Sequence, residues 1–111
     1  MKHVLFLMAG VGALWLAGCA SRTTKIPDPT PKMALELGVA HEELVRGHAS
    51  YLNHCNRCHE RVPPGKIDPE FWRGVLPHMA LRSKIGKVEE HELLLYLLAA
   101  HGTVHGLDLE H

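Results

Sequence analysis

Three residues form the most specific chemical pattern in the chain, the Cys-x-x-Cys-His motif of Cys55, Cys58 and His59. Two thiols at this spacing can add to the two vinyl groups of haem, and the adjacent imidazole can then bind the iron from one face. The imidazole nitrogen that is not on the iron needs a hydrogen-bond partner, and we expect a backbone carbonyl of Pro63 or Pro64 to supply it. The motif predicts one covalently attached haem c, with His59 as the proximal iron ligand.

Three other kinds of site also use a Cys-x-x-Cys pair. A thioredoxin-like redox pair would lie in a βαβ unit, and the sequence has no strand-like alternation. A zinc site would need a second Cys or His pair at metal spacing, and none of the ten histidines forms a tight second pair. A plain disulfide between Cys55 and Cys58 is the simplest structural alternative. The adjacent histidine and the export signal described next favour haem.

The first 18 residues have the pattern of an export signal. Lys2 and His3 give a short positive start, and the apolar run at residues 4–16 is too short to span a membrane as a helix. Leu-Ala-Gly directly before Cys19 resembles the lipobox of bacterial lipoproteins. This resemblance implies that residues 1–18 are a lipoprotein signal peptide and that Cys19 carries lipid. The alternative is an ordinary secretory signal followed by an incidental cysteine.

The predicted organisation after the signal is a tether, a domain and a tail. Residues 19–34 contain three prolines and little apolar material, so they are expected to form an extended tether behind the lipidated Cys19. Residues 35–102 are expected to form the haem domain, and residues 103–111 a flexible tail. Two or three acyl chains anchor a protein stably. The predicted location is therefore the periplasmic side of a bacterial membrane, with the outer membrane as one candidate.

An all-α domain is predicted from hydrophobic periodicity. Apolar and small residues recur at three- and four-residue steps over residues 38–54, which indicates an amphipathic helix. Gly47 lies inside that stripe and lowers helix stability by about 1 kcal/mol relative to alanine. It therefore indicates a place where another element comes close. Residues 87–101 form the last predicted helix, and Gly102 is its expected stop.

A shorter helix is predicted between these two. Asp68 can cap it and Pro69 suits its first position, so it should run from Pro69 to about residue 76. Pro77 is expected to end or kink it, and residues 78–86 look irregular. Such a small helical unit buries little surface on its own, and a large apolar cofactor would complete its core.

A longer pattern resembles a known family. The spacing Gly47-x-x-x-Tyr51-x-x-x-Cys-x-x-Cys-His is similar to the start of class I c-type cytochromes, and Trp72, Met79, Glu89 and the pair Tyr96-Leu97 follow the pattern of small bacterial monohaem members. The resemblance implies a fold of about three helices wrapped around one covalently bound haem. It also implies that the first helix crosses the last one through a small residue and an aromatic.

The resemblance implies a methionine as the second iron ligand, and Met79 alone follows the motif. A thioether opposite an imidazole favours reduced iron and raises the potential. Met79 as simple core packing and His78 as a second histidine ligand are the alternatives. Trp72 could pack on the haem or donate its N–H to a propionate. Residues that could neutralise propionates are Lys66, Arg73 and Arg82; weaker ligand candidates are His48, His54, His91 and His101.

One-electron transfer is the function that the resemblance implies. The chain has 12 basic and 12 acidic side chains, which argues against a nucleic-acid partner. No acid, base or nucleophile arrangement stands out beside the motif, so the protein is predicted to be a monomeric electron carrier with transient redox partners and not an enzyme. The alternatives are a bis-histidine or open-site haem sensor or enzyme, and a haem subunit of a larger oxidoreductase complex.

Overall fold

The computed structural model describes residue 12 and residues 26–105 of the chain. Within them lie four α-helices, α1 (Pro31–Leu37), α2 (His41–His54), α3 (Pro69–Arg82) and α4 (Lys87–His105), and the short 3-10 helix η1 (Pro64–Lys66). These residues include no strand, which confirms the all-α prediction. Cys19, the predicted signal peptide apart from Gly12, and residues 106–111 of the predicted tail lie outside the described residues.

Helix α1 was not predicted. Thr30 caps it, since the Thr30 hydroxyl accepts a hydrogen bond from the Met33 N–H at 3.2 Å, and Pro31 occupies the first turn. Gly38 ends it in the left-handed region with φ of 73°. Met33 and Ala34 are buried in the core. The prediction of an extended tether up to residue 34 is therefore wrong for residues 31–34.

Helices α2 and α4 pack against each other at Gly47. A Cβ atom at this position would lie 2.1 Å from the backbone oxygen of Glu92 and 2.8 Å from the Cβ of Tyr96. The tyrosines of the two helices also meet there, since the ring centroids of Tyr51 and Tyr96 are 5.7 Å apart. The predicted close approach at Gly47 is confirmed, and so is the crossing through a small residue and an aromatic.

Replacing Gly47 with alanine is expected to lower the free energy of unfolding by about 1–3 kcal/mol, because the added methyl overpacks a backbone contact. Gly74 is a matched control in another helix, where an added Cβ would meet nothing within 4 Å. Gly74→Ala should raise stability by about 0.5–1 kcal/mol through helix propensity alone. Chemical denaturation of both variants measures the difference. Equal stabilisation by the two substitutions would contradict the close crossing.

Helix α3 begins as predicted but ends later. The Asp68 carboxylate accepts the N–H of Glu70 at 2.8 Å, and Pro69 follows it in the first turn. The helix then continues across Pro77 to Arg82, so the prediction that it stops near residue 76 is wrong. Pro77 has no N–H, so the carbonyl of Arg73 lacks its usual partner in the helix. Both residues are exposed, so water can satisfy that carbonyl.

Helix α4 also extends beyond its predicted end. Gly102 is buried and the helix continues to His105, so Gly102 is not the stop and residues 103–105 are not part of a flexible tail. The last turn packs on η1, because a Cβ at Gly65 would lie 2.7 Å from a methyl of Val104. This contact supports a helical turn that the local sequence does not favour.

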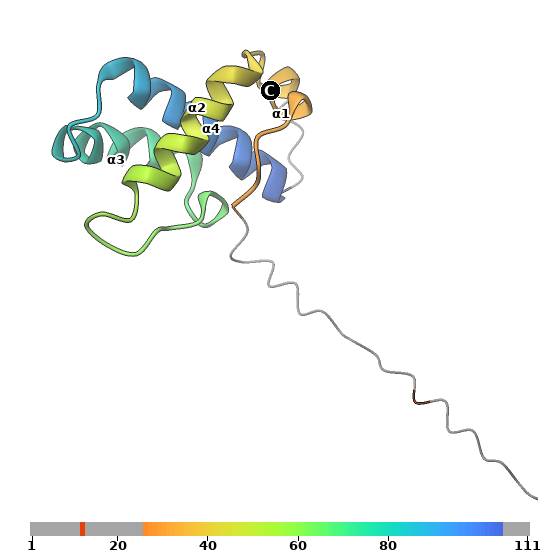
Figure 1. Cartoon of the computed structure of the whole chain (residues 1–111), viewed down its shortest axis with the longest axis horizontal. Coiled ribbons are helices and arrows are strands. Elements are labelled where there is room, and N and C mark those ends of the chain that lie inside the picture. The colour runs from red at the N-terminus through yellow and green to blue at the C-terminus, as the bar shows by residue number, and fades with distance from the viewer. Residues whose placement is uncertain (1–11, 13–25, 106–111) are drawn as a thin grey trace, which may run out of the picture.

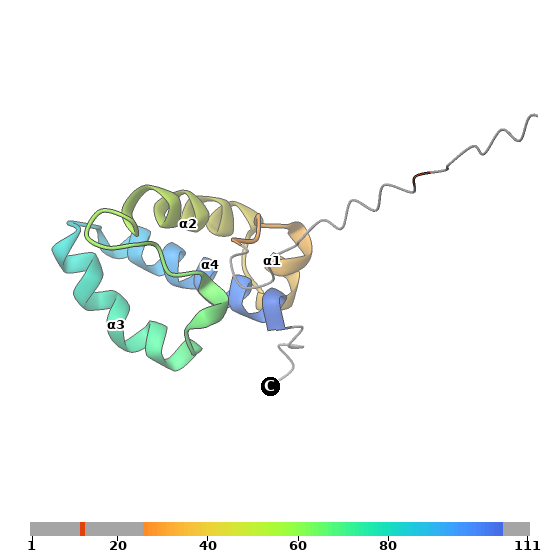
Figure 2. The same ribbon diagram turned by 90° about the horizontal axis from the view of Figure 1, so that it is seen from below.

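The helices form one body around a shared core. Figures 1 and 2 show α2 lying against α4, with α1 and α3 at opposite ends of this pair. The segment before α1 is tied to the body, since the Tyr96 hydroxyl donates to the backbone oxygen of Pro27 at 2.7 Å. The largest buried side chains of the core are Met33, Leu44, Tyr51, Trp72, Leu76, Leu93, Tyr96 and Leu97. None of the described helices has both the length and the apolar character needed to cross a membrane.

Candidate functional site

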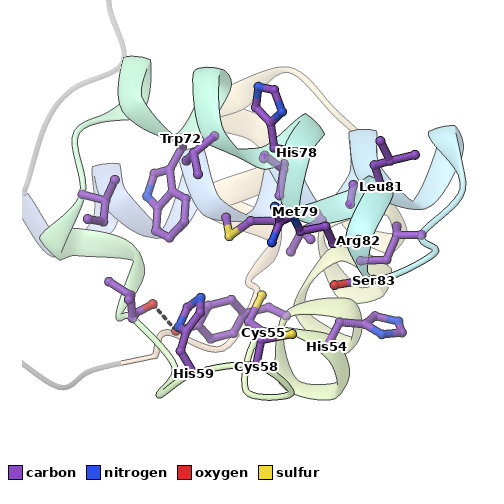
Figure 3. Close-up of a pocket in the computed structure, with 18 of the residues that line it drawn as sticks. His54, Cys55, Cys58, His59, Trp72, His78, Met79, Leu81, Arg82 and Ser83 are labelled. Atoms are coloured by element: carbon purple, nitrogen blue, oxygen red, sulfur yellow. Dashed lines mark hydrogen bonds between the residues drawn. The ribbon is translucent and has the colours of Figure 1, made fainter.

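A cavity of about 730 Å³ opens between α3 and the segment that follows α2. Its size lies within the range of small-molecule and cofactor sites. Cys55, Cys58 and His59 stand on one side, and Trp72 and Met79 on the other, as Figure 3 shows. The structure therefore brings Cys55, Cys58, His59, Trp72 and Met79 to a single place. Most of the remaining wall is apolar, with Val62, Ile67, Phe71, Val75, Leu76, Ala80, Leu81, Ile85 and Leu93.

The two cysteines stand at the end of α2. Cys55 caps this helix, and its N–H donates to the Tyr51 carbonyl at 3.3 Å. Both Cys55 and Cys58 carry free thiols. Burial raises the pKa of the Cys55 thiol, and the charge of Arg61 acts in the opposite direction. Reactive cysteines of dithiol redox pairs have lowered pKa values, so the environment of Cys55 differs from theirs.

The segment after the motif is held by two hydrogen bonds to backbone carbonyls. The Tyr51 hydroxyl donates to Val62 at 2.6 Å, and an Arg61 Nη donates to Leu52 at 2.7 Å. Burial raises the pKa of Tyr51 well above its usual range, so the phenol remains a donor. These two bonds tie the adjacent residues 61 and 62 back to α2, which limits how far the motif between them and the helix can move.

The last turns of α2 are fixed to α4 by a shared carboxylate. Ser50 Oγ donates to Glu89 Oε1 at 2.6 Å, and His54 Nε2 lies 2.9 Å from the same oxygen. The hydrogen bond from Ser50 holds the pKa of Glu89 below its usual value, and His54 contributes in the same direction. The carboxylate is therefore ionised at neutral pH. It anchors the residue directly before Cys55.

His59 has the hydrogen bond that an iron ligand requires, but to a different partner from the one predicted. Its Nδ1 lies 2.8 Å from the backbone oxygen of Glu60. A carbonyl can only accept, so Nδ1 carries the proton and Nε2 keeps a free lone pair. The prediction of Pro63 or Pro64 as the partner is wrong, because the neighbouring residue already meets this need.

The carbonyl of Pro64 binds Trp72 instead. The Trp72 indole N–H donates to it at 3.1 Å, and the side chain is buried in the cavity wall. Trp72 therefore forms part of the cavity wall, and its N–H is engaged by this backbone carbonyl. The bond also joins α3 to η1.

Met79 and His78 are neighbours on α3, and side chains of successive helical residues diverge by about 100°. Figure 3 shows the Met79 sulfur directed into the cavity toward His59 and the two cysteines. The imidazole of His78 points the other way, although the residue contributes to the cavity wall. Of the two ligand candidates, only Met79 faces the motif.

The three basic residues considered for propionates differ in their surroundings. Arg82 is the one lysine or arginine among the cavity-lining residues that the structure describes, and no aspartate or glutamate is among them. Arg73 instead pairs with Glu70 on the same helix at 2.7 Å. Lys66 is exposed on η1 and does not line the cavity. Arg82 can therefore provide a positive charge for an acidic group bound in the cavity.

Phe71 and Leu81 are the exposed members of a set of apolar cavity residues that the sequence did not identify as part of the site. Phe71 is 61% exposed and Leu81 is 80% exposed, and both line the cavity. Trp72, Val75 and Met79 recur at helical spacing in the sequence. This spacing identifies the cavity face of α3 once the helix is taken to continue past Pro77.

The arrangement could hold one large, flat, mainly apolar cofactor through sulfur and imidazole groups. No protein-family model, no curated protein and no solved structure matches the chain.

Proposed function

We propose that the protein is a one-electron carrier with a small cytochrome c-like fold and one covalently bound haem c. The observation that carries this proposal is the placement of Met79 across one cavity from Cys55, Cys58 and His59. A haem in this cavity would need two thiols for its vinyl groups and iron ligands from the two facing walls. In the sequence, 20 positions separate His59 from Met79 (79 − 59), and the fold brings them to the same cavity.

The residues of the cavity fit a haem group. Cys55 and Cys58 supply two thiols three positions apart in the chain, and His59 supplies an imidazole whose Nε2 is free. Met79 supplies a thioether from the facing helix. The apolar walls suit the faces of the macrocycle, and Arg82 supplies a charge complementary to a propionate. When bound, the haem iron supplies the single-electron chemistry.

The chain's own groups would favour electron transfer over substrate chemistry. Two strong protein ligands, His59 and Met79, leave no position open for a substrate. The apolar side chains around them exclude water, and the bonds of Tyr51 and Arg61 limit movement of the motif. A site that rearranges little is suited to rapid gain and loss of an electron. The thioether ligand favours the reduced state.

The proposed setting is the periplasmic side of a bacterial membrane, with the chain anchored through lipid on Cys19. This part of the proposal rests on the Leu-Ala-Gly-Cys sequence. A monomer would exchange electrons with protein partners in transient encounters, which use small interfaces. Phe71 and Leu81 offer exposed apolar contacts at the cavity for such partners.

Visible and near-infrared spectra of the purified protein test the proposal. We expect a haem c spectrum and, in the oxidised state, a near-infrared charge-transfer band from methionine to iron. Reduced protein should not bind carbon monoxide rapidly. Haem without the near-infrared band but with rapid carbon monoxide binding would indicate an open-site sensor or enzyme. Haem without the band and without carbon monoxide binding would indicate a second histidine ligand.

A further inference from the structure

A pair of histidines lies near the end of α4. His101 and His105 are one helical turn apart, so their side chains leave the helix on the same face. Their ring centroids are 4.4 Å apart, and the ring planes are inclined by 34°. Neither residue lines the cavity that contains Cys55 and His59. The pair is therefore a separate place where two imidazoles can act on one ligand.

His105 is already oriented by a hydrogen bond. Its Nε2 lies 2.7 Å from the backbone oxygen of Gly65 in η1. Because a carbonyl can only accept, Nε2 donates and Nδ1 keeps a free lone pair. Histidines that bind metals commonly donate their other ring N–H to a backbone carbonyl in this way, which fixes both the tautomer and the ring.

His101 offers the second imidazole of the pair. Its side chain is partly buried, and its ring lies beside the ring of His105. A second imidazole on the same face of the helix is therefore already in place next to the oriented ring of His105.

We propose that His101 and His105 bind one divalent transition-metal ion of the class that prefers imidazole, such as Zn²⁺, Ni²⁺ or Cu²⁺. The expectation that no histidines form a second pair at metal spacing is wrong here, because α4 continues to His105, and two histidines four residues apart on a helix can share one metal ion. In residues 26–105 no three His, Cys, Asp or Glu side chains are grouped to hold a metal, so water would complete the coordination. The bound ion would link two successive turns of α4 and hold the His105 ring that donates to Gly65 in η1. This proposal does not depend on haem binding.

Calorimetric titration of the full-length protein with Zn²⁺ tests the site, using protein purified without a polyhistidine tag. We expect one equivalent to bind to this pair. His101→Gln and His105→Gln should each weaken that binding by about tenfold or more, because loss of even an outer-shell partner costs 10–100-fold. His91→Gln is the matched control, since His91 is exposed on the same helix and its loss should leave the affinity unchanged.

Thermal unfolding provides a second measurement and shows whether each variant folds. Excess Zn²⁺ should raise the melting temperature of the unsubstituted protein and of His91→Gln. It should not raise that of a His101→Gln/His105→Gln double variant that is folded without metal. A double variant that binds Zn²⁺ as tightly as the unsubstituted protein would overturn the proposal. So would an equal loss of affinity in His91→Gln.

Discussion

Replacing Cys55 or Cys58 with alanine is expected to reduce haem-containing protein to a small fraction of the normal yield. Each substitution removes one of the two thiols that face the cavity. The cavity lies against core side chains of α3 and α4, so a chain without its cofactor has an incomplete core and is open to proteolysis. Haem staining after denaturing electrophoresis measures covalent attachment, and an immunoblot of the same samples measures total chain.

Two controls separate attachment from other effects of substitution. Asn56→Ala changes an exposed residue inside the motif and should leave haem attachment intact. Cys19→Ala removes the proposed lipid site, so it should release the protein from the membrane while haem stays attached. Normal covalent haem in both the Cys55 and the Cys58 variants would show that these thiols do not attach it.

Replacing Met79 with alanine is expected to lower the reduction potential by on the order of 100 mV while the haem remains attached. Axial ligands set haem potentials over a range of about 0.8 V, and the thioether is the ligand that favours reduced iron. For a one-electron couple each 59 mV corresponds to a tenfold change in the equilibrium constant. Redox titration followed by visible absorbance gives the potential, and the methionine-to-iron band should disappear.

Met33→Ala is the matched control for the Met79 variant. Met33 is buried in α1 and does not line the cavity. Its loss should reduce the free energy of unfolding by about 2–5 kcal/mol without the same change in potential. His78→Gln should leave the potential close to normal, because the His78 ring points away from the motif. An unchanged potential in Met79→Ala would assign the ligand role to His78 or to another residue.

Much of the fold could be predicted where local sequence signals decide the structure. Asp68 followed by Pro69 marks the start of α3, and both act there as a cap and a first-turn residue. Gly47 identified the closest approach of two helices, because a glycine inside an amphipathic stripe needs a packing reason. Such signals depend on neighbouring residues in the sequence and need no knowledge of the rest of the fold.

Two other boundaries were missed for different reasons. The proline-rich composition before residue 35 concealed α1, although Thr30, Pro31 and Gly38 carry its start and stop signals. Pro77 lies on an exposed face, where the lost hydrogen bond can be replaced by water, so α3 continues. The end of α3 was therefore decided by solvation, which the local sequence does not display.

The candidate site was predictable to the same extent. Cys55, Cys58 and His59 are identified by their spacing alone. Which of His78 and Met79 faces the motif depends on α3 continuing through both residues, because a helix turns neighbouring side chains in different directions. The hydrogen bonds of His59 and Trp72 depended on which carbonyls the folded loop presents. Ending α4 at Gly102 would also have separated His101 from His105, which the longer helix brings onto one face.

The crossing of α2 and α4 has a consequence for the order of events during biogenesis. Arg46 pairs with Glu92, a partner 46 positions later in the chain, and the Cys-x-x-Cys-His motif lies between them. Because a polypeptide is made from its N-terminus, the motif emerges before α3 can face it and before α4 can pack against α2. During that interval the two thiols belong to an open chain, which an attachment enzyme can reach. Under the proposed function, folding of α3 and α4 would then enclose a haem that is already attached.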